Sequence, residues 1–465
     1  KIVIDATELG DVMGKLKVSY RVGMDSRYDT GESFAPEKAN NIIQDLTYVV
    51  VLKDFGGNAN KTIKKPAGYD PREFDCCCDV QDPASHDNTP KIDCSQMITY
   101  GKLPNGKYMI NWPKCGNDIY MNIIEMNDAD RKAALEKAKL HSLRFIYHLQ
   151  TKLGFKNLGI ADDEFPTADR LPMIAYHRES RRLDGKVTLT LNDVTSPYTQ
   201  KTALYRTGIA VGDYTIDHHH LKNPDAPQID FVKIKVPSYN IPLGALVPKN
   251  TEGLIVAEKS VSVTNIVAGA SRLQPVVLGI GQAAGALAAT AVLSNTDPSN
   301  INIRAVQNAL LESNAYLMPF IDVKPNDASF KVIQKIGATG ILKGTGLSYK
   351  WANQTWFYPE LPVSEWDLVN GLKSFYPAFA ELHPSGNLVN ASFLAGAIKA
   401  IGQKEVSAEQ VIDFLKQQNF KELTAESRLS RRMVAHAIDH FLNPFKAEID
   451  FTGKTQSNQQ PNNNN

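Results

Sequence analysis

The feature that most constrains the fold of this sequence is a strand, a loop and a helix of small residues in succession. Residues 253–257 (Gly-Leu-Ile-Val-Ala) form a short apolar run typical of a buried strand. A Gly- and Ala-rich helix is expected to follow, from about Gly281 to Leu293. Near the start of the chain, residues 2–7 form a β-branched run that stops at Gly10 and suits a buried parallel strand. This order predicts an α/β layer.

Strand patterns and one long helix occupy the region between these runs. The helix is predicted from Asp128 to Leu153, with Asp128 as its N-cap. The stretch between Gly56 and Asn117 is rich in Pro, Gly, Asn and Cys, and is expected to be a loop that serves a site or a partner. Further strands are expected at residues 46–53, 186–191 and 230–236.

Beyond Asn314 the composition shifts toward Phe, Trp, Lys and Asn, and amphipathic helical patterns recur. We therefore expect a separate, mainly helical domain. The patterns cover residues 329–336, 364–374, 391–401, 408–418 and 428–441. Residues 455–465 are mostly Gln and Asn, which cannot bury a core, and are expected to be disordered.

Charge and hydropathy exclude several classes of function. The chain has 51 basic against 50 acidic residues and no long run of one sign, so nucleic acid is not an expected partner. No stretch is expected to reach the roughly 20 apolar residues that span a bilayer. The sequence opens on Lys1 within an apolar run, as expected of a processed or truncated chain.

Three of the five cysteines are consecutive: Cys76, Cys77 and Cys78. This spacing suits neither a C-x-x-C pair nor a zinc ligand set. We expect small buried residues here, rather than a redox pair with Cys94 or Cys115. The odd count makes a disulfide framework an unexpected outcome.

The segment Gly279-Ile-Gly-Gln-Ala-Ala-Gly285 places glycines where the predicted helix begins. Backbone N–H groups can approach a ligand there, and the helix dipole favours negative charge. The same glycines would equally allow a buried helix to pack closely, and both interpretations stay open. No acidic residue follows at the distance that an adenosine-binding turn requires.

Two polar clusters are candidates for contact with a substrate. In Asp217-His218-His219-His220, successive imidazoles of an extended run face opposite sides and cannot converge on one metal ion. His218 and His220 share a side and suit proton transfer, or ordinary polar surface. Arg178 and Arg181 suit recognition of a carboxylate or phosphate, or a solvated loop with internal ion pairs.

An ordered set of motifs carries a family resemblance. The set resembles the FAD-dependent oxidoreductase family, with the glutathione-reductase-type FAD fold, over roughly residues 1–312. Its members are residues 4–11 (Ile-Asp-Ala-Thr-Glu-Leu-Gly-Asp), 36–40 (Pro-Glu-Lys-Ala-Asn), 111–113 (Asn-Trp-Pro), 116–118 (Gly-Asn-Asp), 178–182 (Arg-Glu-Ser-Arg-Arg), 212–214 (Gly-Asp-Tyr), 241–242 (Ile-Pro), 246–248 (Leu-Val-Pro) and 279–285.

The resemblance implies an α/β fold with an incomplete Rossmann-like FAD domain, an inserted α+β substrate domain and a mainly helical C-terminal domain. The implied boundaries are 1–48 and 237–312 for the FAD domain, 49–236 for the insert, 313–452 for the helical domain and 453–465 for the tail. The residues implied near FAD are Ala6, Thr7, Arg272, Pro275, Gly279, Gly281 and Gln282. Asn117 joins Arg178 and Arg181 as an implied substrate-binding residue, and no metal is expected.

The chain departs from the family pattern in two places. The opening Gly-x-Gly-x-x-Gly unit, which seats the pyrophosphate, is missing, and a companion chain is one of the expected sources for it. Glu258-Lys259 stand where the family usually has Gly-Arg. The C-terminal domain resembles a degenerate S-layer-homology repeat, with Val363-Ser-Glu-Trp366 in place of Thr-Arg-Ala-Glu, which favours an exported protein and docking or self-association.

The function expected from the sequence is hydride transfer from a small polar substrate, a sugar-like alcohol or an amine, to flavin N5. His218 and His220 would transfer protons or hydrogen-bond the substrate. One alternative is a binding or scaffold protein with a decayed flavin site. Another is a polysaccharide hydrolase or lyase, with Trp351, Trp356 and Trp366 as stacking surfaces.

Overall fold

The computed structural model describes residues 1–79, 92–220, 222–376, 382–402 and 405–456. Helices and small sheets are both present, as in an α/β protein. By its internal contacts the chain divides into two compact units. The first unit comprises residues 1–40, 181–217 and 229–465, and the second comprises residues 41–180 and 218–228.

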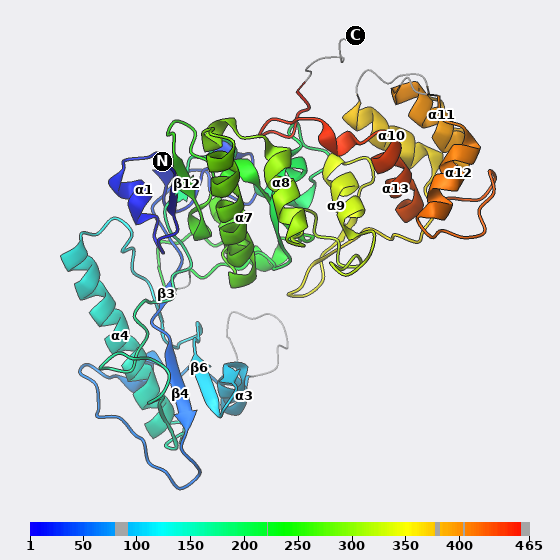
Figure 1. Cartoon of the computed structure of the whole chain (residues 1–465). Helices are drawn as coiled ribbons and strands as arrows, with labels where there is room; N and C mark the ends of the chain where they lie inside the picture. The colour runs from blue at the N-terminus through cyan, green and yellow to red at the C-terminus, as the bar shows by residue number, and fades with distance from the viewer. Residues whose placement is uncertain (80–91, 221, 377–381, 403–404, 457–465) are drawn as a thin grey trace. The chain divides into compact units, whose positions relative to one another are not determined.

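The strands predicted at residues 2–7 and 253–257 pair with each other in the first unit. β1 (Val3–Asp5) and β12 (Leu254–Val256) are parallel, with Val3 opposite Leu254. The small-residue helix α7 (Gln274–Leu293) packs against β12, and α8 (Ile303–Glu312) packs against α7 (Figure 1). The face of α7 toward the core consists of Val276, Ile280, Ala283, Ala284, Leu287 and Ala291.

Helix α7 begins at Gln274, seven residues before the predicted start near Gly281. Pro275 lies in its first turn, where the fixed φ of proline favours helix initiation and its missing N–H leaves no hydrogen bond unmade. The expected position of the helix N-terminus is therefore wrong, although Pro275 carried the signal for the earlier start.

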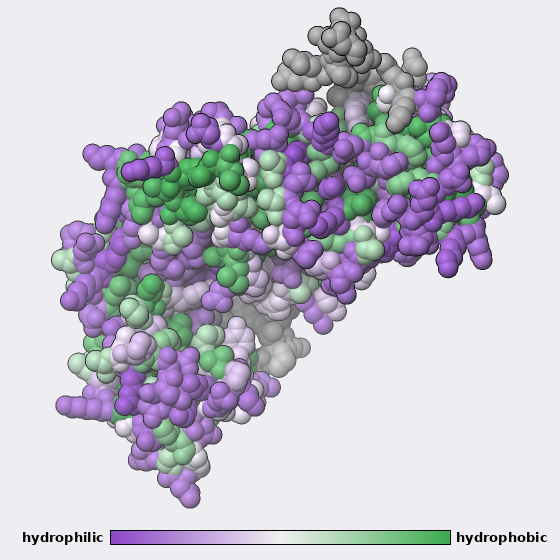
Figure 2. All heavy atoms as spheres, in the orientation of Figure 1, coloured by the Kyte–Doolittle hydropathy of each residue, from purple (hydrophilic) through white to green (hydrophobic). Residues whose placement is uncertain are grey.

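One face of α7 is exposed and apolar. Leu278, Val292 and Leu293 are 75%, 65% and 87% exposed, and Figure 2 shows hydrophobic residues gathered over the position of α7. Within the described ranges, α7 is the one helix whose length and composition would allow it to cross a membrane, and 33% of its most apolar window is buried. The helix is longer than expected, but a single apolar helix with one face in the core gives no clear membrane span.

Short helices and antiparallel strand pairs make up the remainder of the first unit before residue 300. The helices are α1 (Asp11–Lys15), α2 (Arg27–Thr30), α5 (Leu191–Thr195) and α6 (Asn265–Ser271). The pairs are β2 (Tyr20–Arg21) with β9 (Arg182–Leu183), and β10 (Gly208–Gly212) with β11 (Tyr239–Pro242).

The C-terminal part contains the helices that the sequence predicted, together with a hairpin that it did not. The helices are α9 (Phe330–Thr339), α10 (Glu365–Phe375), α11 (Ala391–Gly402), α12 (Ala408–Gln417) and α13 (Arg431–Phe441). The hairpin joins β13 (Thr345–Leu347) to β14 (Gln354–Trp356). Apolar residues of these helices continue the core that surrounds α7. The predicted disordered tail lies, from residue 457 onward, outside the described residues.

The second unit is an antiparallel sheet with a long helix. The strand order is β5 (Lys102–Leu103), β6 (Lys107–Ile110), β4 (Val50–Asp54) and β8 (Leu158–Ile160). The unit also holds α3 (Cys94–Tyr100), α4 (Asp128–Thr151), and the pair β3 (Leu46–Thr47) with β7 (Asp118–Ile119). α4 was predicted, but its N-cap is Asn127, whose side chain accepts a hydrogen bond from Asp130 N.

Two predicted strands and the predicted insert boundaries differ from the structure. Residues 186–190 form no named strand, and α5 begins at Leu191; residues 231–233 form a 3₁₀ turn. Both segments alternate in polarity, but neither has a partner strand in the ladders of the described residues. The expected insert, 49–236, also includes residues 181–217, which pack in the first unit, where β9 pairs with β2.

Candidate functional site

The carboxyl ends of β1 and β12 form the first candidate site, because ligands of parallel α/β sheets bind beyond the carboxyl ends of the strands. Asp5, the last residue of β1, is buried. Its carboxylate accepts hydrogen bonds from Thr7 N at 3.0 Å, Thr7 Oγ1 at 2.6 Å and Met13 N at 2.7 Å. These bonds fix the turn that leads into α1 and leave Ala6 exposed and Thr7 half-buried at the strand end.

A buried lysine lies in the turn after β12. Lys259 Nζ is 2.8 Å from Glu8 Oε1 and 2.7 Å from Glu258 Oε2. Glu258 has a φ of +62°, in the left-handed region that favours glycine. Glu258 replaces the glycine that the family usually has here, yet its backbone keeps a conformation typical of glycine. The Glu258 carboxylate contacts Lys259.

The exposed N-terminus of α7 follows a buried arginine. Leu273 is the N-cap, and no side chain of the described residues caps this end of the helix. Arg272 Nη2 donates to Asp217 O at 3.3 Å and to Asp217 Oδ2 at 3.2 Å. Gln274 and Pro275 are exposed, so the first turn of a 20-residue helix presents its partial positive charge at the surface.

The glycines predicted at the start of this helix lie inside it. A Cβ on Gly279 would lie 3.1 Å from Ala210 Cβ, so Gly279 allows α7 to pack closely on β10. Gly281 has open space at the Cβ position, and Gly281 and Gln282 are exposed. Of the two interpretations of these glycines, close packing holds for Gly279, and the open helix end lies instead at residues 273–276.

Arg181 is held by the segment that follows β1. Its Nη1 donates to Leu9 O and to Asp11 Oδ1, both at 2.9 Å. A Cβ on Gly14 would lie 2.9 Å from Arg181 Nε, so the guanidinium packs directly against α1. Arg181 is 7% exposed and lies within the protein rather than at an open surface.

Arg178 belongs to a buried cluster in the second unit. It donates to Asp45 O at 2.7 Å and to Thr47 Oγ1 at 3.1 Å, and it pairs with Asp118 Oδ1 at 3.2 Å. His219 Nδ1 lies 3.4 Å from Asp118 Oδ2. Because the partners come from distant parts of the sequence, the motif around Arg178 did not reveal this cluster.

The two carboxyl groups of the cluster differ in protonation. Burial disfavours the charge of Asp118, but the hydrogen bond from His219 and the charge of Arg178 outweigh burial and hold the pKa of Asp118 below its usual value. Burial raises the pKa of Asp45 to about 6, although the backbone N–H of Lys222 and the charge of Arg178 oppose the rise. Of these two carboxyl groups, Asp45 therefore titrates closer to neutral pH.

Asn117 and the two predicted histidines also lie in the second unit. Asn117 donates to Ile110 O at 2.9 Å, accepts from Trp112 N at 2.9 Å, and is fully buried. The rings of His218 and His220 are stacked, with centroids 5.1 Å apart and planes at 8°. Burial and the neighbouring charge of His219 lower the pKa of His220 to about 4, so its imidazole is neutral at neutral pH.

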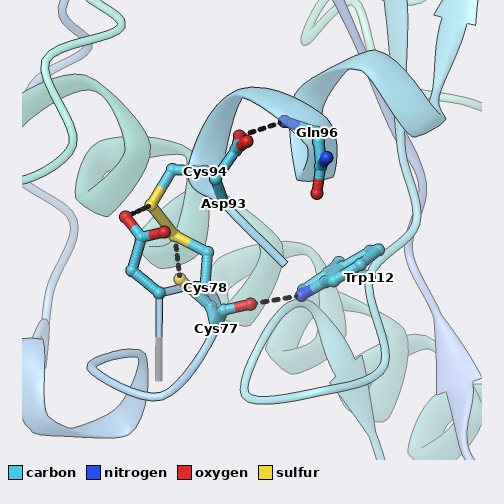
Figure 3. Close-up of a disulfide and its surroundings, with 7 residues drawn as sticks. Cys77, Cys78, Asp93, Cys94, Gln96 and Trp112 are labelled. Carbon is cyan, nitrogen blue, oxygen red and sulfur yellow. Dashed lines mark hydrogen bonds between the residues drawn. A yellow bond between two sulfur atoms is a disulfide. The ribbon is translucent and has the colours of Figure 1, made fainter. Parts of the chain in front are cut away.

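The cysteines form two disulfides in the second unit, Cys76–Cys115 and Cys78–Cys94. Cys77 is the free thiol; it is buried, and its Sγ is 3.7 Å from Cys78 Sγ (Figure 3). The preference for small unpaired residues is therefore wrong. Adjacent cysteines can each pair with a distant partner, and the odd count leaves one thiol over. Burial raises the pKa of this thiol to about 11.

A family model for FAD dependent oxidoreductases matches residues 1–310, which include all of these groups. This chain belongs to that family. No curated protein and no solved structure matches the chain. FAD is the cofactor of the family, and the resemblance carried by the sequence motifs is confirmed at this level.

The flavin end of FAD fits the first unit of this family member. Its electron-rich edge suits the uncapped first turn of α7, beside which Arg272 lies paired with Asp217. Small side chains at the end of β1, Ala6 and Thr7, leave the strand end open to a planar ring. Contacts of Ala6, Thr7, Arg272 and Pro275 with the flavin stay predictions.

The pyrophosphate end of FAD does not fit α1 in the same way. The first turn of α1 carries Asp11, whose charge would repel a phosphate, and its N–H already donates to Thr7 Oγ1 at 2.7 Å. A Gly-x-Gly-x-x-Gly sequence occurs nowhere in the 465 residues. The described residues therefore offer contacts for the flavin, but not a phosphate-binding turn.

Proposed function

We propose that this chain carries the flavin half of an oxidoreductase site that removes hydride from a small polar substrate, a sugar-like alcohol or an amine. The observation that supports this best is the uncapped, exposed N-terminus of α7 beside Arg272. When bound, FAD supplies the two-electron acceptor. The dipole of α7 and the Arg272 guanidinium would stabilise the negative charge that a flavin gains on reduction.

We propose that His218 and His220 handle the proton that leaves the substrate together with the hydride. A neutral imidazole can accept a hydroxyl proton, and the lowered pKa of His220 keeps its ring neutral at neutral pH. Replacing either histidine with Ala should lower turnover and leave the flavin content unchanged. His383→Ala, a change of an exposed histidine, is the matched control. Unchanged kinetics in both variants would remove this role.

The internal bonds of Arg178, Arg181 and Asn117 favour a different role from the predicted contact with substrate. We propose that they act as positioning residues that hold loops of their own units in place. Substitution would then alter folding or kcat without a selective rise in KM for anionic substrates. Such a selective rise would instead support the original assignment.

The decisive experiment moves a negative charge along α7. Gln274→Glu adds a carboxylate at the proposed flavin end, whereas Gln282→Glu adds the same charge to the same exposed face two turns later. Only Gln274→Glu should lower the reduction potential of bound FAD and its affinity, as measured by spectroelectrochemistry and FAD titration. If Gln282→Glu alone has this effect, the site lies at the glycines.

We also propose that a strand–glycine–helix segment, on this chain or on a companion chain, completes the site beside β1. Two-stranded parallel sheets are uncommon alone because parallel strands are normally covered on both faces. Val3 and Ile4 are nevertheless 49% and 39% exposed, and so is the apolar face of α7. Intact mass and gel analysis of the protein from its native source, beside its flavin spectrum, would reveal such a segment.

A scaffold protein with a decayed flavin site is the second candidate. The ion pairs of Lys259 with Glu8 and Glu258 favour it, because these carboxylates neutralise the lysine within the fold. A colourless protein that takes up no FAD, with or without an added glycine-turn segment, would support this candidate. The two disulfides favour an oxidising compartment for either candidate, in keeping with the proposed export.

A further inference from the structure

A separate cavity of about 340 Å³ lies in the first unit. Its walls come from residues before and after position 310, where the family match ends. One wall is the end of α5 and the segment after it, residues 193–199, and a second is residues 235–240, which include the start of β11. The third wall, Met318, Pro319 and the β13–β14 hairpin, comes from beyond residue 310. The volume is in the range of small-molecule sites, about 300–1,000 Å³.

The walls of this cavity are largely apolar and aromatic. Val194, Leu204 and Val236 are buried side chains that line it. Tyr198 and Tyr205 meet edge to face, with ring centroids 4.8 Å apart and planes at 72°. An edge-to-face tyrosine pair provides flat surface against which another ring can pack.

Several polar side chains of the walls already make hydrogen bonds within the protein. Ser238 Oγ donates to Thr355 Oγ1 at 2.8 Å, and Asn240 Nδ2 donates to Tyr205 O at 2.9 Å and Leu317 O at 3.0 Å. Asp193 Oδ2 accepts from Thr190 Oγ1 at 2.6 Å in the capping box of α5. Lys235 also lines the cavity, but it is exposed, so a charged ligand inside would lose its hydration without gaining a buried matching charge.

Tyr198 lines the cavity with a hydroxyl that keeps a hydrogen to donate. Its Oη accepts a hydrogen bond from Gly344 N at 3.3 Å, and among the bonds of the described residues this hydroxyl appears only as an acceptor. Burial raises the pKa of Tyr198, so the phenol keeps its proton and retains one hydrogen to donate. A ligand in the cavity would meet this donor beside apolar walls.

The hairpin closes tightly over this site. A Cβ on Gly346, in β13, would lie 2.6 Å from Pro237 Cβ, so β13 can approach residues 235–237 only because position 346 has no side chain. The hairpin therefore forms a fixed wall rather than a loose cover.

We propose that this cavity binds a small, uncharged ring compound with a single hydrogen-bond acceptor, such as a carbonyl oxygen, directed at Tyr198 Oη. The ring would pack against Tyr198, Tyr205 and the apolar wall. This site is independent of the flavin contacts at α7, and its occupancy does not require FAD.

The test uses saturation-transfer NMR on the purified full-length chain with four probes. Acetophenone carries the ring and the acceptor, toluene only the ring, benzoate a charge, and methyl glucoside a polar ring. We expect transfer to acetophenone, weaker transfer to toluene, and none to benzoate or methyl glucoside. Equal transfer to either of the last two, or none to acetophenone, would overturn the proposed ligand class.

A matched pair of variants tests the donor. Tyr198→Phe removes one hydroxyl and should weaken acetophenone binding about five- to tenfold, the effect of one hydrogen bond, while toluene binding stays the same. Tyr28→Phe, a change of a tyrosine that is 77% exposed, should alter neither. Retained toluene binding shows that the cavity of Tyr198→Phe is intact. Loss of both probes, or of neither, would overturn the role of Tyr198.

Discussion

Two clusters of charged residues, one in each unit, differ in how far their carboxylates are exposed to solvent. In the first unit, Lys259 is buried, but its partners Glu8 and Glu258 have side chains 30% and 21% exposed. In the second unit, Arg178 and Asp118 have side chains 2% and 0% exposed. Exposed carboxylates can exchange a partner for water or a ligand with little loss, whereas a fully buried pair cannot. The first cluster can rearrange at little cost, whereas the second holds segments of the fold together.

Removing one cation from each cluster should give the largest difference in the free energy of unfolding. Arg178→Met leaves Asp118 buried without its cation, and should lower the free energy of unfolding by about 3 to 5 kcal/mol. Lys259→Met leaves carboxylates that water can reach, and should cost about 1 kcal/mol. Urea titration followed by hydrogen exchange would locate each loss.

Arg72→Met is the control for this comparison. Arg72 also lies in the second unit and pairs with Asp70, but its side chain is 85% exposed. Its substitution should leave stability unchanged. Equal losses from Arg178→Met and Lys259→Met would show that exposure does not separate the two clusters.

Reducing the disulfides should weaken the second unit alone. The Cys76–Cys115 bond joins residues 39 positions apart, so chain entropy predicts a loss of about 3 to 4 kcal/mol when Cys76 and Cys115 are both replaced by Ser. Hydrogen exchange should speed up around Arg178 and remain the same in β1 and β12. Faster exchange in those strands would show that the two units unfold together.

Asp45 should make the stability of the second unit depend on pH. Its folded pKa, about 6, is above the unfolded value of 3.8, so the folded state binds the proton more tightly. This contribution is fully present below the unfolded value and is lost as pH rises through about 6, for a change of about 3 kcal/mol. Asp45→Asn should therefore gain stability relative to the native protein between pH 4 and pH 7.5. A constant difference across this range would contradict the assignment.

The smallest effect concerns Cys77, which should report openings of the second unit. Since burial raises its pKa to about 11, little thiolate exists at pH 7.5, and alkylation should be slow until the unit opens. The alkylation rate, followed by intact mass, should rise about tenfold per pH unit. Arg178→Met should accelerate it, whereas Lys259→Met should not. Rapid labelling of the native protein would mean that Cys77 is accessible.

Regular patterns allowed the sequence to predict β1, β12 and the C-terminal helices. Local hydrophobic periodicity predicts these elements, and it can be recognised without knowing which elements pack against them. Residues 186–191 and 230–236 have strand-like alternation, but a strand requires a neighbour to bond with, and the sequence does not reveal the neighbour. The predicted start of α7 was too late because it was based on the glycines at 279 and 281 rather than on the proline at 275.

The buried cluster and the disulfides depend on contacts between distant residues. Asp45, Asp118 and Arg178 stand more than 50 positions apart, and no spacing rule connects them. Cysteine pairing is set by the fold in the same way. By contrast, Ala6, Thr7, Arg272 and Pro275 were named through an ordered family resemblance, and their contacts with FAD stay predictions.

The pairing of β1 with β12 has a consequence for how the protein is made. Val3 and Leu254 are partners, so the first strand must wait until the ribosome has added about 250 more residues. At about 5 to 20 residues per second, this wait lasts roughly 10 to 50 seconds. During that time an apolar strand stays unpaired, which makes the nascent chain a natural client for chaperones that shield strands early in synthesis.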